Sequence, residues 1–356
     1  MAFTEHPEVD KVVLVPFTKV TAGILMFSDV EVVGVCDYRE DKVGRSTAEL
    51  VEGDVPDLEI RHVNDLPEVL EDAEWLVWTK EVFDRDVHYE VWSRVIDTAI
   101  LEGVNVYNMG RLHMFREDES KRLEAAKRGL RYFDASDPEL HLKMMPYGVK
   151  AREEGVNADV VAVIGAARRT GKFTTLNTIR EILEDEGVKV GTVGTEPSSM
   201  LVGLDAMVIP QVIPLAHAAP TILGAVKYVD EEKEPDVILV GSQTGVTADP
   251  LEVGTGRGGC VCSITILTGC APDLLVAATR PDTLDELREA IEVAQTLTGA
   301  RVQFVSVNGK GYDEEEVRKV CERIEDELGY PAADPVKMRE EFEELVIDLL
   351  KPESET

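Results

Sequence analysis

The chain has 356 residues, of which 44% are hydrophobic, and its 69 acidic and 37 basic side chains give a formal net charge of −32. This length favours two domains, each with a core of its own. The charge argues against nucleic acid and anionic membranes as partners, because both attract basic surfaces. We therefore expect a small-molecule substrate, no nucleic-acid partner and no membrane partner.

The N-terminal sequence MAFTEHPEVDKVVLVPF has acidic residues before a short apolar run, which is not typical of a signal peptide. The chain has five cysteines, too few for a disulfide framework, and we expect a cytoplasmic protein with reduced thiols. Cys260, Cys262 and Cys270 could hold a metal, but neither a CxxC pair nor a nearby histidine completes a tetrahedral set. Abundant Glu with scarce Asn and Gln fits a thermophile.

The first half of the chain alternates apolar strands with amphipathic helices. Strands are expected at 12–16 (VVLVP), 31–37, 75–78, VNVYNMG and LRYFDAS, with helices at 90–102 and 119–129. This alternation predicts a doubly wound, Rossmann-like domain over residues 1–140. Asp37 ends the second strand, where an acid can hold a ribose, but the first loop, PFTKVTAG, lacks a GxGxxG motif. We therefore expect a degenerate Rossmann domain without bound NAD.

The second half of the chain repeats the α/β alternation. A polar connector over 141–157 leads into successive strands from DVVAVIG to VQFVSVNG, and an amphipathic helix over 336–351 closes the chain. Residues 158–356 are therefore predicted to form a P-loop NTPase-like domain. The predicted fold class is α/β, with two tandem doubly wound domains. Exposed sheet edges make a homo-oligomer our expectation.

The sequence VIGAARRTGKFTT places a glycine loop between a strand and a helix. Glycine permits the turns that point backbone N–H groups inward, and the helix presents its N-terminus to an anion. A lysine in this loop can reach a terminal phosphate, and a threonine hydroxyl can ligate Mg²⁺. The predicted phosphate- or nucleotide-binding residues are Gly165, Ala166, Arg168, Arg169, Thr170, Gly171, Lys172, Thr174 and Thr175.

The spacing of this loop departs from the common P-loop motif. Five residues separate Gly165 from Gly171 instead of four, and Phe173 follows Lys172 where a hydroxyl residue is usual. A five-residue gap also occurs in enzymes that resemble dethiobiotin synthetase. The alternative interpretation is an ordinary strand–helix turn with chance basic residues.

Over almost its full length the chain resembles the DgcN-like family, long classed as a domain of unknown function. The family loop reads Gly, five residues, Gly-Lys, one residue, Thr-Thr, and GAARRTGKFTT has this spacing. TAILEGVNVYNMGRLHMF, with Gly110 and His113, is similar to a Gly-Leu-His signature. FDASDPE, DVILVGSQTGVTADP, LTGCAPDLLVAATRP and GYPAADPV are similar to further family segments.

The resemblance implies a Rossmann-like N-terminal domain, a P-loop C-terminal domain and the N-acetylation of D-glutamate with acetyl-CoA. The chain departs from the family at three points. Gly241 or Ser242 stands where the family has Glu, Asp249 stands where it has His, and FDASDPE lacks the family's Arg. These changes leave open whether the substrate is the same.

Other candidate residues follow the strands of the second domain. Glu196 follows VKVGTVGT and is the best carboxylate for Mg²⁺ or for catalysis; its alternative is a helix cap or an exposed loop acid. The loop from Ser242 contains Gln243, Thr244 and Gly245, which we expect to bind substrate. Arg257, as a catalytic residue, and Arg280, as a substrate residue, could hold a carboxylate, or they could form surface ion pairs.

The two histidines that we weighed differ in their sequence context. His113 carries the family match and is the better catalytic histidine, whereas His217 lies in the apolar run PLAHAAP, which favours a core histidine.

Three functions remain open on the sequence. The first is a P-loop transferase for a small acidic, amino-acid-like metabolite, with acetyl-CoA as the donor that the resemblance implies. The second is a kinase or ligase that uses ATP and Mg²⁺ and resembles dethiobiotin synthetase. The third is a nucleotide-binding regulator without chemistry. The strand DVILVG ends without an acid, which lowers the case for ATP hydrolysis.

Overall fold

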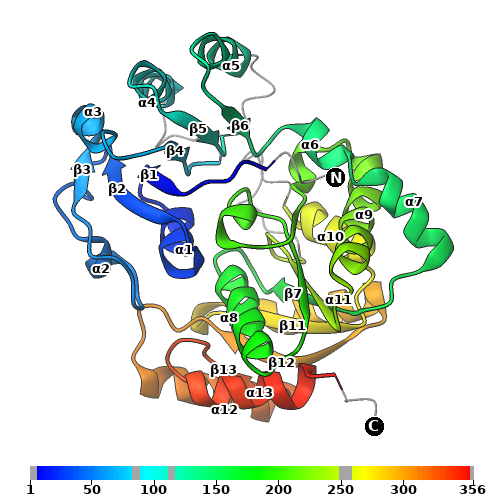
Figure 1. Ribbon diagram of the computed structural model, residues 1–356. Helices are drawn as coiled ribbons and strands as arrows, with labels where there is room; N and C mark the ends of the chain where they lie inside the picture. The colour runs from blue at the N-terminus through cyan, green and yellow to red at the C-terminus, as the bar shows by residue number, and fades with distance from the viewer. Residues whose placement is uncertain (1–5, 82–88, 111–116, 248–258, 353–356) are drawn as a thin grey trace. The chain divides into compact units, whose positions relative to one another are not determined.

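The computed structural model describes residues 6–81, 89–110, 117–247 and 259–352 (Figure 1). The chain forms two compact α/β units. Unit 1 consists of Met1–Leu140 and Pro197–Gly203, and unit 2 of His141–Glu196 and Leu204–Thr356. Among the described residues, no helix is both long and apolar enough to cross a membrane.

In the described part of unit 1, one parallel sheet has the strand order β3-β2-β1-β4-β5-β6. This is the strand order of dinucleotide-binding folds, and it confirms the predicted doubly wound architecture. The strands are β1 (Lys11–Val15), β2 (Glu31–Asp37), β3 (Ile60–His62), β4 (Trp75–Trp78), β5 (Asn105–Asn108) and β6 (Tyr132–Asp134). The helices are α1 (Lys19–Phe27), α2 (Thr47–Leu50), α3 (Leu66–Val69), α4 (Tyr89–Leu101), α5 (Glu117–Lys127) and α6 (Pro138–Leu142), the last of which runs into unit 2.

The core of unit 1 lies between the sheet and the helices α3 and α4. All residues of β4 are buried, and so are those of β1 after Lys11, as expected for central strands covered on both faces. Trp92 of α4 is fully buried, and its indole N–H donates to the side-chain oxygen of Asn108 at 3.2 Å. Packing of this helix therefore also holds the end of β5.

A short segment from the second half of the chain completes unit 1. It contains the 3-10 helix η2 (Ser199–Val202), which packs against α1. The hydroxyl of the fully buried Tyr107 donates to the carbonyl oxygen of Pro197 at 3.0 Å, and Ser28 donates to the carbonyl oxygen of Leu201. Burial raises the pKa of Tyr107, so its hydroxyl remains a donor.

In the described part of unit 2, a second parallel sheet has the order β13-β12-β11-β7-β10-β8-β9. Its central strand β7 is buried along almost its whole length, which explains the continuous apolar run. The strands are β7 (Asp159–Gly165), β8 (Val190–Gly194), β9 (Ala206–Met207), β10 (Val237–Gly241), β11 (Leu274–Thr279), β12 (Arg301–Val307) and β13 (Ala332–Ala333).

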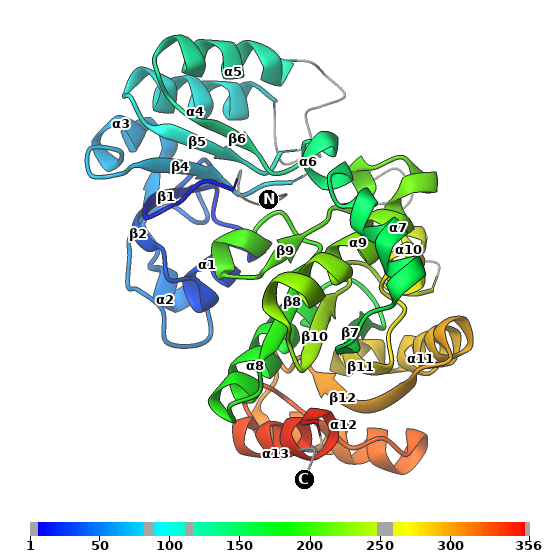
Figure 2. The ribbon, with the colours of Figure 1, turned by 45° about the vertical axis from the view of Figure 1, so that its right-hand side comes forward.

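Helices cover both faces of this sheet (Figure 2). One face carries α8 (Lys172–Asp185) and α13 (Arg339–Leu350), which contact each other, and the other carries α9 (Leu215–Lys233), α10 (Cys260–Cys270) and α11 (Leu284–Thr298). The helix α12 (Glu314–Leu328) lies beside α11, where Arg288 donates to the carbonyl oxygen of Glu327 at 3.3 Å. Short 3-10 turns η3 (Pro210–Val212) and η5 (Pro281–Thr283) lie after β9 and β11. Because all strands are parallel, the loops after β7, β8, β10, β11 and β12 meet at one edge of the sheet.

Residues 141–157, expected as a connector, include the helix α7 (Met145–Glu154), which packs on α9. The two backbones approach closely: a Cβ added to Gly148 would lie 2.1 Å from the carbonyl oxygen of Pro220. A Cβ added to Gly224 would lie 1.9 Å from the carbonyl oxygen of Met144. Glycine at both positions therefore allows α7 to join the layer of helices around unit 2.

Candidate phosphate-binding site

The loop between β7 and α8 has the backbone of an anion cradle. Gly171 precedes the helix with φ 91°. Because glycine has no side chain, the N-terminus of the helix has no side-chain cap. The N–H groups of the first helical turn have no partner within the helix and can bind an anion. Arg169 also has a positive φ, 62°, which is uncommon for a residue other than glycine and is typical of functional loops.

The ammonium group of Lys172 lies inside this loop. Its Nζ donates to the carbonyl oxygen of Ala167 at 2.8 Å and lies 3.4 Å from Oγ1 of Thr170. A Cβ added to Gly165 would lie 2.6 Å from Nζ and 2.7 Å from the Thr170 hydroxyl oxygen. A side chain at position 165 would therefore displace the Lys172 ammonium and the Thr170 hydroxyl from their present positions.

The two threonines after Phe173 differ in what they can do. The Thr175 hydroxyl donates to the carbonyl oxygen of Gly171 at 3.1 Å and lies 2.7 Å from the hydroxyl of Ser306, and the residue is fully buried. This geometry does not suit Thr175 as a metal ligand, because its hydroxyl points toward Gly171 and Ser306. Thr174 is half-buried, and its hydroxyl has no hydrogen-bond partner among the described residues.

Asn308, directly after β12, holds the outer side of the loop. Its Nδ2 donates to the carbonyl oxygen of Arg169 at 3.2 Å, and its Cβ would lie 3.0 Å from a Cβ added to Gly171. Asn308 thus supports the loop at Arg169 and leaves little room for a side chain at position 171. The sequence analysis missed it; the only signal is the Asn-Gly pair at the end of an apolar strand.

The loop after β10 packs against the phosphate loop. A Cβ added to Gly245 would lie 2.9 Å from the carbonyl oxygen of Ala166. Thr244 donates to the carbonyl oxygen of Gly259 at 2.6 Å, and its hydroxyl lies 3.0 Å from that of Ser263. Of the predicted substrate residues, Gly245 therefore lies against the phosphate loop, whereas the side chains of Gln243 and Thr244 bond to Thr195 and to Gly259 and Ser263.

The remaining candidates lie at several positions. Glu196 follows β8 at the same edge of the sheet, with one carboxylate oxygen buried. Arg280 follows β11, and its Nε lies 2.9 Å from Oδ1 of Asp282; this contact raises the pKa of the guanidinium. His113 and Arg257 lie outside the described residues.

His217 is exposed in the first turn of α9, so the expectation of a core histidine is wrong. The apolar run predicts burial only in its later part, because a helix begins here and turns its first residues outward.

The three clustered cysteines are free thiols. Cys262 and Cys270 are buried, and burial raises the pKa of Cys270 to about 12. Within the described ranges, no group of three or more His, Cys, Asp or Glu side chains is arranged to hold a metal ion.

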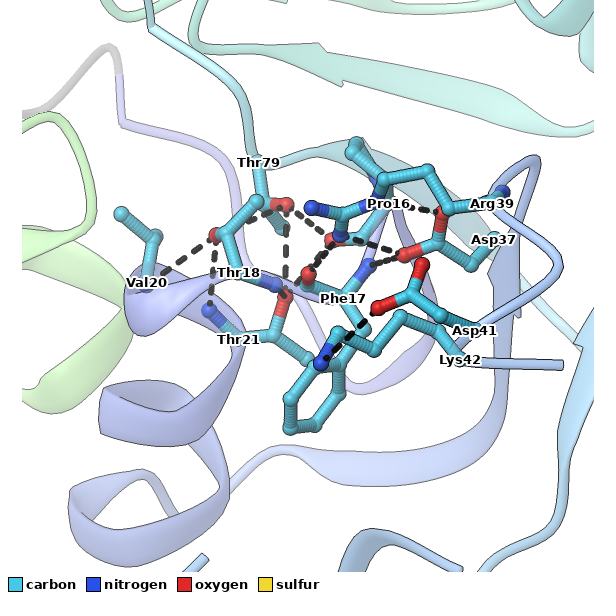
Figure 3. A network of polar contacts seen from close by, with 10 residues as sticks. All are labelled: Pro16, Phe17, Thr18, Val20, Thr21, Asp37, Arg39, Asp41, Lys42 and Thr79. Carbon is cyan, nitrogen blue, oxygen red and sulfur yellow. Dashed lines mark hydrogen bonds and ion pairs between the residues drawn. The ribbon is translucent and has the colours of Figure 1, made fainter. Parts of the chain in front are cut away.

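The corresponding loop of unit 1, between β1 and α1, is filled by protein groups (Figure 3). Asp37 is fully buried and accepts hydrogen bonds from the backbone N–H of Phe17 at 3.0 Å and of Arg39 at 2.9 Å. The Arg39 guanidinium adds an ion pair with Asp37 at 2.6 Å. The acid that would hold a ribose in this fold is therefore fully engaged.

The N-terminus of α1 is also closed. The Thr18 hydroxyl accepts from the N–H groups of Val20 at 3.1 Å and Thr21 at 3.4 Å (Figure 3). The hydroxyls of Thr21 and Thr79 donate to the carbonyl oxygen of Pro16 at 2.8 and 2.5 Å. These bonds explain physically why a Rossmann-like unit without a glycine loop offers no phosphate cradle at this position.

Comparison with protein families gives two matches that together cover most of the chain. A model described as a domain of unknown function (DUF1611_C), P-loop domain, matches residues 148–346. A model described as a domain of unknown function (DUF1611_N), Rossmann-like domain, matches residues 40–138. A search of curated proteins gave no match.

Among solved structures, a DUF1611 family protein from Anabaena variabilis is similar, with a TM-score of 0.73 and 18% identity over 95% of this chain and 99% of that one. This likeness shows the fold alone. Cobyrinic acid a,c-diamide synthase from Mycobacterium smegmatis, with bound ADP and magnesium, gives a TM-score of 0.38 and 14% identity over 55% of this chain and 94% of that one. The cell division protein MinD from Aquifex aeolicus gives 0.34 and 17% over 52% and 86%. These two scores are too low to carry an argument about function.

Proposed function

The chain belongs to the DUF1611 family, and we propose that it is a P-loop transferase that acts on a small acidic, amino-acid-like metabolite. The observation that carries the proposal is the Lys172 ammonium above Gly165, at a helix N-terminus that no side chain caps. Residues 158–356 form the donor-binding domain in this account. The loop binds the phosphates of the donor, with Arg168 and Arg169 adding charge.

The donor that we propose is acetyl-CoA, as the resemblance to the DgcN-like family implies, with D-glutamate as the acceptor. In this reaction the acceptor amine attacks the thioester carbonyl. A C–N bond forms, the C–S bond breaks, the amine loses a proton and CoA leaves as the thiol. We propose that Glu196, the carboxylate that follows β8 at this edge of the sheet, accepts the amine proton and passes it to the leaving sulfur. The loop holds the donor in position. This accounts for much of the rate in our proposal, because acetyl transfer needs the donor thioester and the acceptor amine to be bound close together and correctly oriented.

The threonine geometry supports donor binding over phosphate hydrolysis. The Thr175 hydroxyl is bound to Gly171 and Ser306, Phe173 follows Lys172, and β10 ends in Gly241 without an acid. If Mg²⁺ binds, we propose that Thr174 and Glu196 hold it, and the ion would neutralise phosphate charge. The buried carboxylate oxygen of Glu196 is the observation that favours the second candidate, a kinase or ligase that uses Mg-ATP.

The test is a product assay. The protein is incubated with acetyl-CoA and D-glutamate, L-glutamate or aspartate, and free CoA thiol and N-acetylated product are measured by mass spectrometry. We expect stoichiometric CoA and N-acetyl product, both lost in Lys172→Ala and retained in Lys189→Ala. Lys189 is exposed just before β8, at the opposite edge of the sheet. ADP release from Mg-ATP without CoA release would contradict acetyl transfer and favour the second candidate.

A further inference from the structure

Two glutamine side chains form a hydrogen-bonded row at the carboxyl ends of the strands of unit 2, on the far side of β10 from the phosphate loop. Gln243 follows β10, and its Nε2 donates to the carbonyl oxygen of Thr195, which follows β8. Gln211 lies in η3 after β9, and its Nε2 donates to Oε1 of Gln243. The row therefore runs along the carboxyl ends of the strands, on the side of β10 away from β7.

The direction of this row is fixed by the backbone. An isolated amide can be placed either way round, because its oxygen and nitrogen look alike. A carbonyl oxygen can only accept, so Gln243 must present its NH₂ group to Thr195 and its oxygen to Gln211. Gln211 must then present its own NH₂ group to Gln243. The thiol of Cys262, a weak donor at 3.9 Å from Oε1 of Gln243, is consistent with this direction.

The row ends in an acceptor without a donor. Oε1 of Gln211 is buried and has no hydrogen-bond partner among the described residues. A buried acceptor that stays unpaired is unfavourable, and an apolar residue of similar size would avoid the penalty. Each amide NH₂ group of the row uses one of its two N–H donors within the row, and the carboxylate of Glu196 follows Thr195 directly. This edge therefore favours a ligand group that donates hydrogen bonds and carries positive charge.

We propose that Gln211 accepts a hydrogen bond from the amino group of the acceptor substrate, and thereby selects amines over hydroxy and unsubstituted acids. The inference rests on the proposed function and adds the chemical group that the site recognises. The oxygen is buried. The substrate amine therefore reaches it when side chains at this edge move aside, and Gln243 keeps the oxygen in position.

The experiment compares ligands that differ only in the amino group. Binding of D-glutamate, L-glutamate and glutarate is measured calorimetrically in the wild type, in Gln211→Met and in the control Gln303→Met. Gln303 lies on β12, and among the residues that the structure describes its side chain donates to the carbonyl oxygen of Arg301 alone. We expect the wild type and Gln303→Met to prefer one glutamate over glutarate by about tenfold or more. In Gln211→Met we expect the affinities for that glutamate and for glutarate to agree within about twofold.

Three results would overturn the inference: equal affinities in the wild type, an unchanged preference in Gln211→Met, or no binding of either amino acid. Acetyl-CoA is titrated into the same proteins. If it binds through Lys172 while the amine preference is absent, only the inference about Gln211 fails. If it does not bind while the preference depends on Gln211, the proposed donor fails instead.

A second variant tests the direction of the row without any ligand. In Gln211→Glu, the introduced carboxyl can donate to Gln243 only when protonated, so the folded state should raise its pKa. A raised acid pKa stabilises the fold below the unfolded value of about 4.3 and loses that contribution as the pH rises through the folded value. We expect the free energy of unfolding of Gln211→Glu, relative to wild type, to fall between about pH 4 and about pH 7. Gln303→Glu should show no such decline, and a flat profile for Gln211→Glu would contradict the direction of the row.

Discussion

In each unit the first strand of the sheet leads through a loop into a helix, and the two loops differ in what occupies the helix N-terminus. In unit 1, Thr18 caps α1 and Asp37 binds the loop backbone. In unit 2, Gly171 leaves α8 without a side-chain cap, and the Lys172 ammonium lies in the loop. One fold class therefore supports a closed structural turn and an open anion cradle, and a few side chains decide between them.

The largest effect is expected from closing the second cradle. Gly165→Ala places a methyl group 2.6 Å from the position of Nζ and forces Lys172 out of the loop. We expect the affinity for the phosphate-bearing donor to fall about 100-fold, equivalent to about 2.7 kcal/mol. Calorimetric titration measures the affinity, and thermal unfolding shows that the protein remains folded. Unchanged affinity in a folded variant would mean that the donor binds elsewhere.

The next effect concerns the closed loop of unit 1. Asp37→Asn removes a charge that binds Phe17 and Arg39, and buried charged hydrogen bonds of this kind are strong. We expect the free energy of unfolding to fall by about 2 kcal/mol in chemical denaturation, with donor affinity unchanged. The exposed carboxylate of Asp41, 3.4 Å from Lys42, supplies the control Asp41→Asn, which should be neutral. Lost donor affinity in Asp37→Asn would show that unit 1 takes part in donor binding.

Asn308→Ala removes the side chain that supports the loop at Arg169. We expect about a tenfold loss of donor affinity, equivalent to about 1.4 kcal/mol, because the strained backbone loses its hydrogen bond. The readout is the dissociation constant, since a general loss of stability would not lower the affinity of the remaining folded protein. Asn64→Ala, at an exposed asparagine of unit 1, is the control. Full affinity in Asn308→Ala would mean that the loop keeps its shape alone.

The smallest effect separates the two threonines. Thr175→Val should lower the free energy of unfolding by about 1 kcal/mol through loss of the bond to Ser306, with donor affinity retained. Thr174→Val should leave stability unchanged and abolish any Mg²⁺ dependence of donor binding. Denaturation and titrations with and without Mg²⁺ measure both. If Thr175→Val instead removed the Mg²⁺ dependence and Thr174→Val lowered the stability, Thr175 would be the residue that turns toward the ligand.

The regular parts of the fold were predictable from the sequence because buried strands and helices require apolar residues in continuous or periodic runs. DVVAVIG became β7, WLVW became β4, and the terminal amphipathic stretch became α13. The short edge strands β3 and β13 were missed, since three and two residues carry no periodic signal. The segment Pro197–Gly203 joins unit 1 through tertiary contacts, which local patterns do not encode.

The candidate site shows the same division. The phosphate loop was recognisable because its chemistry is local: glycines, a lysine and a helix start follow one another in the chain. Gln211 and Asn308 were not recognisable, because each acts on residues that are distant in sequence. The hydroxyl of Thr175 could not be assigned either, since its partner Ser306 lies 131 residues away.

The most direct test of the account is calorimetric titration of the protein with acetyl-CoA and, separately, with Mg-ATP, in wild type, Lys172→Ala and Lys189→Ala. The account predicts that acetyl-CoA binds preferentially and that Lys172→Ala weakens it by about 10- to 100-fold, as expected for loss of a charged hydrogen bond. Lys189→Ala should bind as the wild type does. Preferential binding of Mg-ATP would contradict acetyl transfer, and equal acetyl-CoA affinity in Lys172→Ala would contradict the phosphate cradle itself.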